Sequence, residues 1–194
     1  FVSQEMSEKE SDVALINPKW ALVYWDDQSL VYLKRGGKYD SIIKKDEYKF
    51  VKPANSVDIY KARLQDEGFR INLIEELSRN VSETGSKKAY SFLKHIGAEH
   101  FGRGVDAYEK QNYQLAIEEF KKSIEAAPSD PTVYCNLGYA YYDMGMLDKA
   151  YEYQKNAITI DPNLAYAHYG LALIYVRWGD NEKAIQHFKK YLRI

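Results

Sequence analysis

The sequence predicts a mainly α-helical fold, in which a superhelix of helical hairpins follows a small α/β unit with an antiparallel hairpin. From residue 97 onward, small, large and turn-forming residues recur with a period of 34 residues, a spacing typical of stacked helical hairpins. Before Pro53 the pattern consists of short β-branched and aromatic runs, which are typical of strands. We therefore divide the chain into an α/β unit (1–54), a helical linker or capping hairpin (55–96), and three repeat units (97–130, 131–164 and 165–194).

Two neighbouring runs in the α/β unit suit an antiparallel hairpin. Residues 20–25 (WALVYW) and 29–35 (SLVYLKR) are rich in strand-forming residues. Asp26 and Asp27 lie between them, and a tight turn explains two adjacent carboxylates better than catalysis does, because Asp side chains bond turn backbone. The other elements expected in this unit are a strand at 12–16, a short helix that Asp40 caps and that continues through Glu47, and a strand at 48–52 that Pro53 ends.

The linker has helical spacing at 57–64, 69–81 and 86–100. In the second of these segments, one face carries the apolar residues Ile71, Ile74, Leu77 and Val81. We expect the linker helices to cover the exposed end of the repeat stack, since terminal repeats need a cap.

Each position of the 34-residue period keeps its character from one unit to the next. Gly145 and Gly179 can adopt the positive φ that ends a helix, and Pro128 and Pro162 stop the second helix of a unit. Small residues recur where two helices cross, at Gly104, Gly138 and Ala172 and at Ala116, Ala150 and Ala184. Larger packing columns are His100, Tyr134 and His168; Arg103, Leu137 and Leu171; Ala107, Tyr141 and Tyr175; and Phe120, Gln154 and Phe188.

These columns, and the stretch NLGYAYYDMGMLDKAYEYQKNAITIDP in particular, resemble the tetratricopeptide repeat (TPR) over about residues 97–194. Gln154, Gln111 and Arg103 depart from the family pattern, and we expect them to weaken single contacts rather than the fold. A second resemblance covers 12–53: NPKWALVYWDDQSLVYLKR is similar to the soluble tail of bacterial multi-span membrane proteins of the glycosyltransferase type. That resemblance implies an extracytoplasmic location, and without it a cytoplasmic one is expected.

Composition excludes some function classes. A formal net charge of -1 and the lack of a basic stripe argue against nucleic-acid binding. The longest apolar stretch, Leu171 to Val176, is too short to insert this segment into a membrane. One cysteine, Cys135, cannot form an internal disulfide. The chain opens on Phe1 and stops at Ile194 within an amphipathic run, so we expect it to be part of a longer protein, which membrane spans elsewhere could anchor.

No group of residues predicts catalysis, a metal site or a cofactor. His95, Glu99 and His100 could be imagined as metal ligands, but His100 lies in a packing column. The glycines of the GRG stretch at 102–104 follow no strand, so helix packing explains them better than phosphate binding. Cys135 has no neighbouring base in the sequence and is expected to fill space.

The aromatic residues of the first helices suggest a binding surface. Helical spacing separates a packing face from a second face, and the TPR resemblance implies that this second face lines a concave groove. The residues predicted to bind a partner there are Phe101, Val105, Tyr108, Cys135, Asn136, Tyr139, Tyr142, Tyr166, Tyr169 and Leu173, with Glu109, Asp143 and Arg177 as the nearest charges. Some family members grip a terminal carboxylate with a clamp of Lys, Asn and Arg side chains. Asn136 fits one clamp position, but Phe101, Val105, Tyr166 and Gly170 replace the other polar residues, so a clamp is not expected.

The sequence thus predicts a non-enzymatic protein-interaction module whose groove receives a peptide or helix of a partner. Missing helices of the parent protein, or another copy of it, could fill the groove instead. The alternative function is an extracytoplasmic accessory domain of a membrane-embedded glycosyltransferase-like protein, in which Trp20, Trp25 and the tyrosines stack on sugar rings. The sequence leaves the partner and the oligomeric state open.

Overall fold

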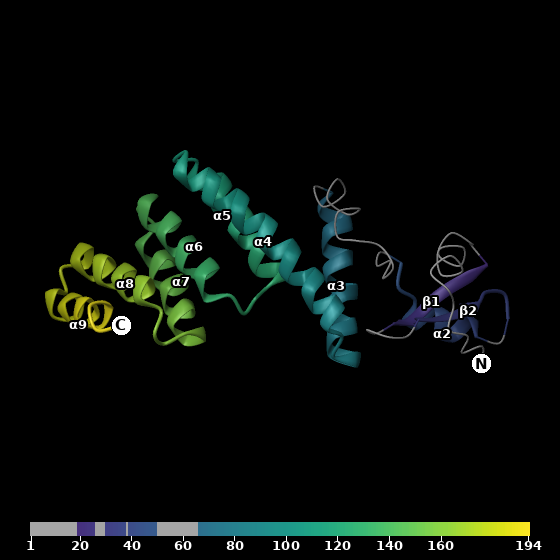
Figure 1. Cartoon of the computed structure of the whole chain (residues 1–194). Helices are drawn as coiled ribbons and strands as arrows, with labels where there is room; N and C mark the ends of the chain where they lie inside the picture. The colour runs from purple at the N-terminus through teal and green to yellow at the C-terminus, as the bar shows by residue number, and fades with distance from the viewer. Residues whose placement is uncertain (1–18, 26–29, 38, 50–65) are drawn as a thin grey trace. The chain divides into compact units, whose positions relative to one another are not determined.

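A computed structural model describes residues 19–25, 30–37, 39–49 and 66–194 (Figure 1). The chain forms two compact units, residues 1–95 and 96–194. The predicted fold class is confirmed: the described residues are mainly helical and include an antiparallel strand pair near the N-terminus. The strand predicted at 12–16, the turn at 26–28, the strand from residue 50 onward and the helix at 57–64 lie outside the described residues.

Strands β1 (Trp20–Trp25) and β2 (Leu30–Lys34) form the predicted antiparallel hairpin. Ala21, Leu22 and Trp25 are buried, whereas Tyr24 and Val31 are exposed, so one side of the hairpin packs on the rest of the unit. Trp25 is 0% exposed. The alternative that Trp25 stacks on sugar rings is therefore wrong, because its ring has no accessible face.

Helix α2 (Asp40–Asp46) begins and ends differently from the prediction. Tyr39 holds the N-cap position and gives no side-chain cap, so the expected capping role of Asp40 is wrong. The Asp40 carboxylate instead accepts hydrogen bonds from the backbone N–H groups of Gly36, at 2.9 Å, and Gly37, at 3.1 Å. Asp40 therefore orders the loop that precedes the helix. Tyr48 and Lys49, which were expected to begin a strand, lie in irregular structure.

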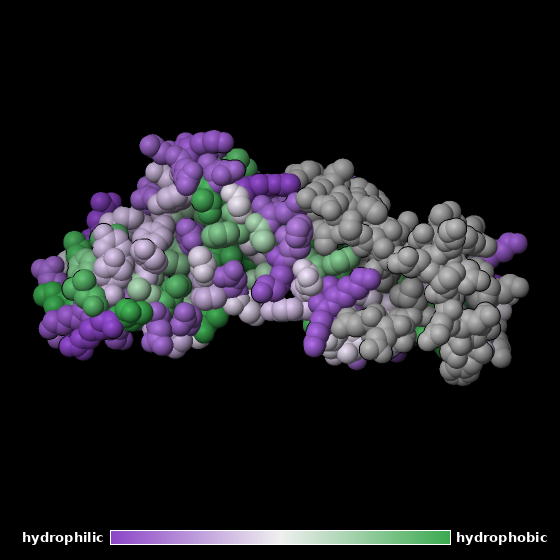
Figure 2. Space-filling model, viewed as in Figure 1, coloured by the Kyte–Doolittle hydropathy of each residue, from purple (hydrophilic) through white to green (hydrophobic). Residues whose placement is uncertain are grey.

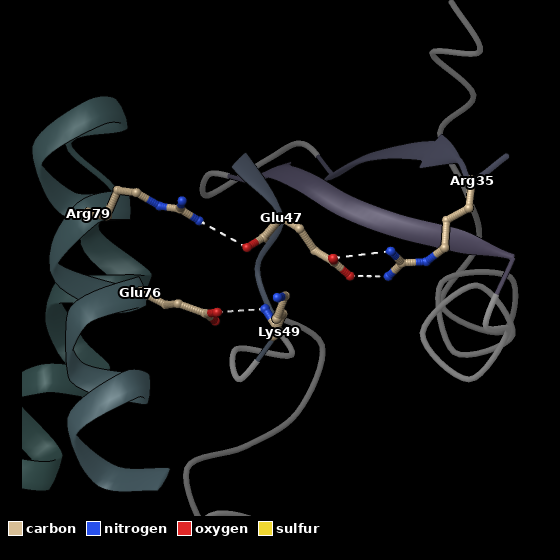
Figure 3. Close-up of polar contacts among 5 residues, drawn as sticks. All are labelled: Arg35, Glu47, Lys49, Glu76 and Arg79. Atoms are coloured by element: carbon tan, nitrogen blue, oxygen red, sulfur yellow. Dashed lines mark hydrogen bonds and ion pairs between the residues drawn. The ribbon is translucent and has the colours of Figure 1, made fainter. Parts of the chain in front are cut away.

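Helix α3 (Glu67–Thr84) covers the predicted helix at 69–81 and contacts the segment that follows α2 (Figure 3). The guanidinium of Arg79 donates to the backbone carbonyls of Asp46, at 3.2 Å, and Glu47, at 3.4 Å, and lies 4.1 Å from the ring centre of Tyr48. Asn80, which is buried, donates its side-chain amide to the carbonyl of Trp25. These contacts join α3 to backbone carbonyls of β1 and of the C-terminal end of α2.

Two further polar contacts join the segment after α2 to its surroundings. Glu76 of α3 accepts the backbone N–H of Lys49 at 2.6 Å, and Glu47 pairs with Arg35, which follows β2 (Figure 3). The small α/β unit therefore depends on α3 for its shape, as its size predicts.

The helices that follow run in antiparallel pairs: α4 (Lys87–Glu109) with α5 (Tyr113–Ala126), α6 (Pro131–Asp143) with α7 (Leu147–Ile160), and α8 (Ala165–Trp178) with α9 (Asn181–Tyr191) (Figure 1). Gly145 (φ 74°) and Gly179 (φ 78°) occupy the left-handed region between the helices of a pair, as predicted. Gln111 does the same in the first pair with φ 58°. A left-handed backbone is uncommon for a residue with a side chain, so this departure from the repeat pattern adds strain to one turn.

The first two pairs pack closely at their glycines. A β-carbon at Gly104 would lie 2.5 Å from the ring of Phe120, and one at Gly138 would lie 2.8 Å from the amide nitrogen of Gln154. Gln154 also contacts Gly170 of α8 on its other side, where a β-carbon would lie 2.6 Å from the amide carbon of Gln154. Its amide donates to the carbonyl of Cys135 at 3.1 Å. Gln154 therefore fills a slot between two glycines, which explains how a polar residue replaces the usual apolar one.

A second recurring contact joins positions 19 residues apart in each pair of helices. His100 Nδ1 lies 2.7 Å from the Glu119 carboxylate, and His168 Nδ1 lies 3.1 Å from His187 Nδ1. In the middle pair the corresponding tyrosine rings are 6.5 Å apart at their centres, for Tyr134 and Tyr153. The column of His100, Tyr134 and His168 is thus a packing column, as predicted.

Hydrogen bonds orient the two histidine rings of the last hairpin. His168 Nε2 lies 3.1 Å from the carbonyl of Pro162, an acceptor, so Nε2 carries the proton and Nδ1 can accept from His187. Burial, followed by the charges of His168, Lys190 and Lys155, lowers the pKa of His187 to about 4. Its ring also stacks on Tyr175, with centres 5.5 Å apart.

The first prediction concerns Gly138. Gly138→Ala should lower the free energy of unfolding by about 1–3 kcal/mol, because Gln154 cannot withdraw from the added methyl group. Adding Gln154→Ala to that variant should recover part of the loss by removing the obstruction. Urea unfolding followed by circular dichroism measures both effects.

Gly102→Ala is the matched control, because a β-carbon at this helical glycine would meet nothing within 4 Å. Here we expect a gain of about 0.5–1 kcal/mol from the better helix former. Equal effects of Gly102→Ala and Gly138→Ala would show that helix propensity, and not close packing, governs the second site.

The second prediction concerns pH. Between pH values of about 6.5 and 4 the unfolded chain binds a proton at His187 that the folded chain does not, so the free energy of unfolding should fall as the pH decreases through this window. His187→Phe keeps an aromatic ring against Tyr175 and should remove about 1–3 kcal/mol of this dependence. Urea unfolding at pH values of about 7 and 4.5 gives the comparison, with the exposed His95→Phe as control. The same pH dependence in both variants would contradict the prediction.

Candidate functional site

The predicted binding residues lie on the first helix of each pair. We define the aromatic face as nine of them: Phe101, Val105 and Tyr108 on α4, Asn136, Tyr139 and Tyr142 on α6, and Tyr166, Tyr169 and Leu173 on α8. Tyr166 is 65% exposed, and the other eight are partly buried. Side chains of this kind keep part of their surface available to a partner.

Cys135, the tenth predicted residue, does not line this face. It is 3% exposed and packs in a small core with Ala157 and Ala167. Burial raises the pKa of the Cys135 thiol to about 12, so it is neutral at physiological pH and a poor nucleophile. Helical spacing placed Cys135 on the correct side of α6, but two alanines allow the neighbouring helices to approach and cover it.

Two contacts at equivalent positions of the repeat join successive first helices along the aromatic face. The hydroxyl of Tyr108 on α4 donates to the carboxylate of Asp143 on α6. One repeat further along, the guanidinium of Arg177 on α8 lies 5.7 Å from the ring centre of Tyr142 on α6. In both cases a tyrosine of one unit meets the charged residue 35 positions later, in the next unit. Sequence reasoning identified these charges as neighbours of the face but missed the pairing, which this spacing could have indicated.

Other tyrosines of the aromatic face contact neighbouring residues of the repeat stack. The hydroxyl of Tyr139 donates to the backbone carbonyl of Tyr166 at 2.7 Å. The ring of Tyr169 lies 5.2 Å from that of Tyr191 and 5.9 Å from that of Phe188, both on α9. The face is therefore an interconnected layer, and not a set of independent side chains.

Burial raises the pKa of the Tyr108 and Tyr139 hydroxyls, and the hydrogen bond to Asp143 raises that of Tyr108 further. Both groups stay neutral at physiological pH. Because each already donates its proton within the chain, what remains for a ligand is the ring surface and an oxygen that can accept a hydrogen bond.

The polar groups of the face do not form a carboxylate clamp. The side-chain amide of Asn136 donates to the carbonyl of Thr132 in its own helix at 2.9 Å. Arg177 lies over Tyr142, and Asp143 adds a negative charge at the same place. An acidic ligand would meet little positive charge here.

The remaining candidates for chemistry belong to the packing. Burial alone would raise the pKa of Glu119, but hydrogen bonds from His100 and Lys122 outweigh it and lower that pKa. Glu119 is thus a carboxylate held in place by hydrogen bonds from His100 and Lys122.

Within the described residues, no three His, Cys, Asp or Glu side chains gather as a metal site would require. Gly102 and Gly104 lie inside α4, where no phosphate loop is possible. In the same part of the chain, no helix has the length and apolar character needed to span a bilayer.

Comparison with known proteins agrees with this geometry. Residues 106–145 match a family model described as TPR repeat, and residues 129–194 match one described as tetratricopeptide repeat. The TPR repeat-containing thioredoxin TTL4 of Arabidopsis thaliana is 34% identical over 80 residues, which are 41% of this chain but only 12% of that protein.

Two solved structures share the fold of the hairpins. The Arabidopsis OM64 TPR domain aligns with a TM-score of 0.51 at 18% identity, over 52% of this chain and 83% of its own. The second TPR of Spaghetti (RPAP3), bound to the HSP90 peptide SRMEEVD, aligns with a TM-score of 0.50 at 22% identity, over 51% of this chain and 92% of its own. The helical hairpins within residues 106–194 are therefore tetratricopeptide repeats, as the spacing of the sequence predicts.

Proposed function

We propose that the aromatic face binds an extended or helical segment of a partner protein. The observation that carries the proposal is the arrangement of the face: three successive first helices present partly exposed rings, and contacts between the units hold these rings in fixed positions. Tyrosine suits such a role because it offers a large contact area with little side-chain entropy to lose. A pre-ordered face loses less freedom when it binds, which favours affinity.

The chemistry of the face favours an apolar ligand segment with few acidic residues. The HSP90 peptide bound by the Spaghetti domain contains three acidic side chains, whereas this face offers Asp143 and an arginine already engaged with Tyr142. Phe101, Val105 and Tyr166 give ring and methyl surface at positions where a clamp would need polar groups. We therefore propose binding through apolar side chains of the ligand, with backbone N–H groups donating to tyrosine oxygens.

The third prediction tests the face directly. Peptides selected from a random library on the whole chain should bind at least tenfold more weakly to Tyr166→Ala and to Tyr142→Ala, because aromatic anchors commonly carry most of an interface's energy. Since Tyr166 is 65% exposed, its replacement should leave the melting temperature nearly unchanged. Fluorescence polarisation with labelled peptides measures the affinities.

Tyr90→Ala is the control. Tyr90 is 52% exposed and lies on the first turn of α4, outside the aromatic face, so its removal should not affect binding. Selected peptides that bind all three variants as tightly as the unmodified chain would place the binding surface elsewhere.

A further inference from the structure

At one end of the aromatic face, a carboxylate occupies the position where the next repeat unit has a cation. The guanidinium of Arg177 on α8 lies 5.7 Å from the ring centre of Tyr142, so this tyrosine already has a cation at its ring. The equivalent partner of Tyr108 is Asp143, which accepts a hydrogen bond from the hydroxyl. Among the described residues, no Lys or Arg side chain lies over the ring of Tyr108.

Two aromatic rings and a carboxylate meet at this end of the face. The ring centres of Tyr108, on α4, and Tyr113, at the start of α5, are 5.5 Å apart, and their planes are inclined at 60°. Both side chains are partly exposed, and Asp143 is exposed. We call Tyr108, Tyr113 and Asp143 the acidic corner. It lies where the first two helix pairs meet, so the helices on both sides of it are present in the structure.

The charge around the acidic corner is negative. Asp143 forms no ion pair with a Lys, Arg or His side chain of the described residues. Asp106 and Glu109, both exposed on the last turn of α4, add two further carboxylates, against one base, Lys110, in the turn that follows. On the side drawn in Figure 2, the turn end of the α4–α5 pair is hydrophilic. A cationic group of a ligand would therefore be attracted to this corner.

Asp143 can bind such a group without releasing Tyr108. The hydroxyl of Tyr108 donates one hydrogen bond, whereas a carboxylate has two oxygens that together accept several. A cation that approaches the free oxygen also comes close to the ring of Tyr108, because the hydroxyl ties this ring to the same carboxylate. The ring face attracts a cation through its quadrupole, which adds to the attraction of the carboxylate.

We propose, on the basis of the proposed function of the aromatic face, that the acidic corner binds a basic side chain of the partner segment, arginine in preference to lysine. The planar guanidinium can lie on a tyrosine ring and donate to a carboxylate at the same time, whereas an ammonium group is a compact point charge. The ligand thereby repeats, between two chains, the contact that Arg177 makes with Tyr142 within one. The basic residue fixes the position of the segment, whose apolar side chains lie on the rest of the aromatic face.

Peptides selected from a random library on the whole chain are the probes. Their aligned sequences should share an arginine or lysine at one position. Replacing that residue by glutamine should weaken binding to the unmodified chain roughly five- to twentyfold, because the cation loses both the ring and the carboxylate. Fluorescence polarisation measures the affinities, and higher salt should weaken the basic peptides more than their glutamine versions, since the ion pair is exposed.

Asp143→Asn locates the contact. Asparagine keeps the shape of the side chain and an oxygen that can accept from Tyr108, so the melting temperature should stay nearly unchanged. This variant should bind the basic peptides roughly three- to tenfold more weakly, yet bind their glutamine versions as tightly as the unmodified chain does. Asp148→Asn is the control, because it removes an exposed carboxylate from the first turn of α7, and it should leave both affinities unchanged.

Tyr166→Ala separates the acidic corner from the aromatic face as a whole. Peptides that this variant binds weakly, but that share no basic residue or bind Asp143→Asn as tightly as the unmodified chain, would overturn the role of the acidic corner and leave the proposed function in place. Peptides that bind Tyr166→Ala and Tyr142→Ala without loss, or a library that yields no binder, would overturn both.

Discussion

The close approach of paired helices at glycine is the constraint on which the repeat stack depends. Gly104 lets the ring of Phe120 pack against the backbone of α4, and Gly138 and Gly170 together enclose the amide of Gln154. A side chain at any of these positions would push two helices apart. Their spacing in turn decides whether Tyr108 on one first helix can reach Asp143 on the next. Packing at the centre of the hairpins therefore positions the surface at their edge.

The aromatic face has a structural role as well as the proposed binding role. Tyr139 holds the backbone of α8 through its hydroxyl, and Tyr169 packs on α9. Such contacts keep the rings ordered before a ligand arrives, but they also mean that removing a tyrosine can disturb the scaffold. Tyr166 is the member that separates the two roles best, because most of its surface is exposed.

The repeat period predicted the hairpins, their turn glycines and the packing column of His100, because these depend on local backbone geometry and on a regular spacing. The burial of individual side chains was harder to predict. Helical spacing put Cys135 on the binding side, but whether a side chain reaches the surface depends on the size of residues on other helices, here Ala157 and Ala167. The sequence pattern predicted that Gln154 weakens the packing of its helix. It did not reveal how the side chain fits, because the facing Gly170 belongs to the next unit. In the α/β unit the composition predicted the strands. The burial of Trp25 depends on partners distant in the sequence, and Asp40 contacts a loop outside its own helix.

The coupling between Tyr108 and Asp143 tests most directly whether packing at glycine positions the aromatic face. A double-mutant cycle with Tyr108→Phe and Asp143→Ala measures this coupling, first in the unmodified chain and then in a background that carries Gly138→Ala. We expect a coupling free energy of about 1 kcal/mol in the unmodified chain and much less in the altered background, because a displaced α6 carries Asp143 away from the hydroxyl. The same coupling in both backgrounds would contradict this account.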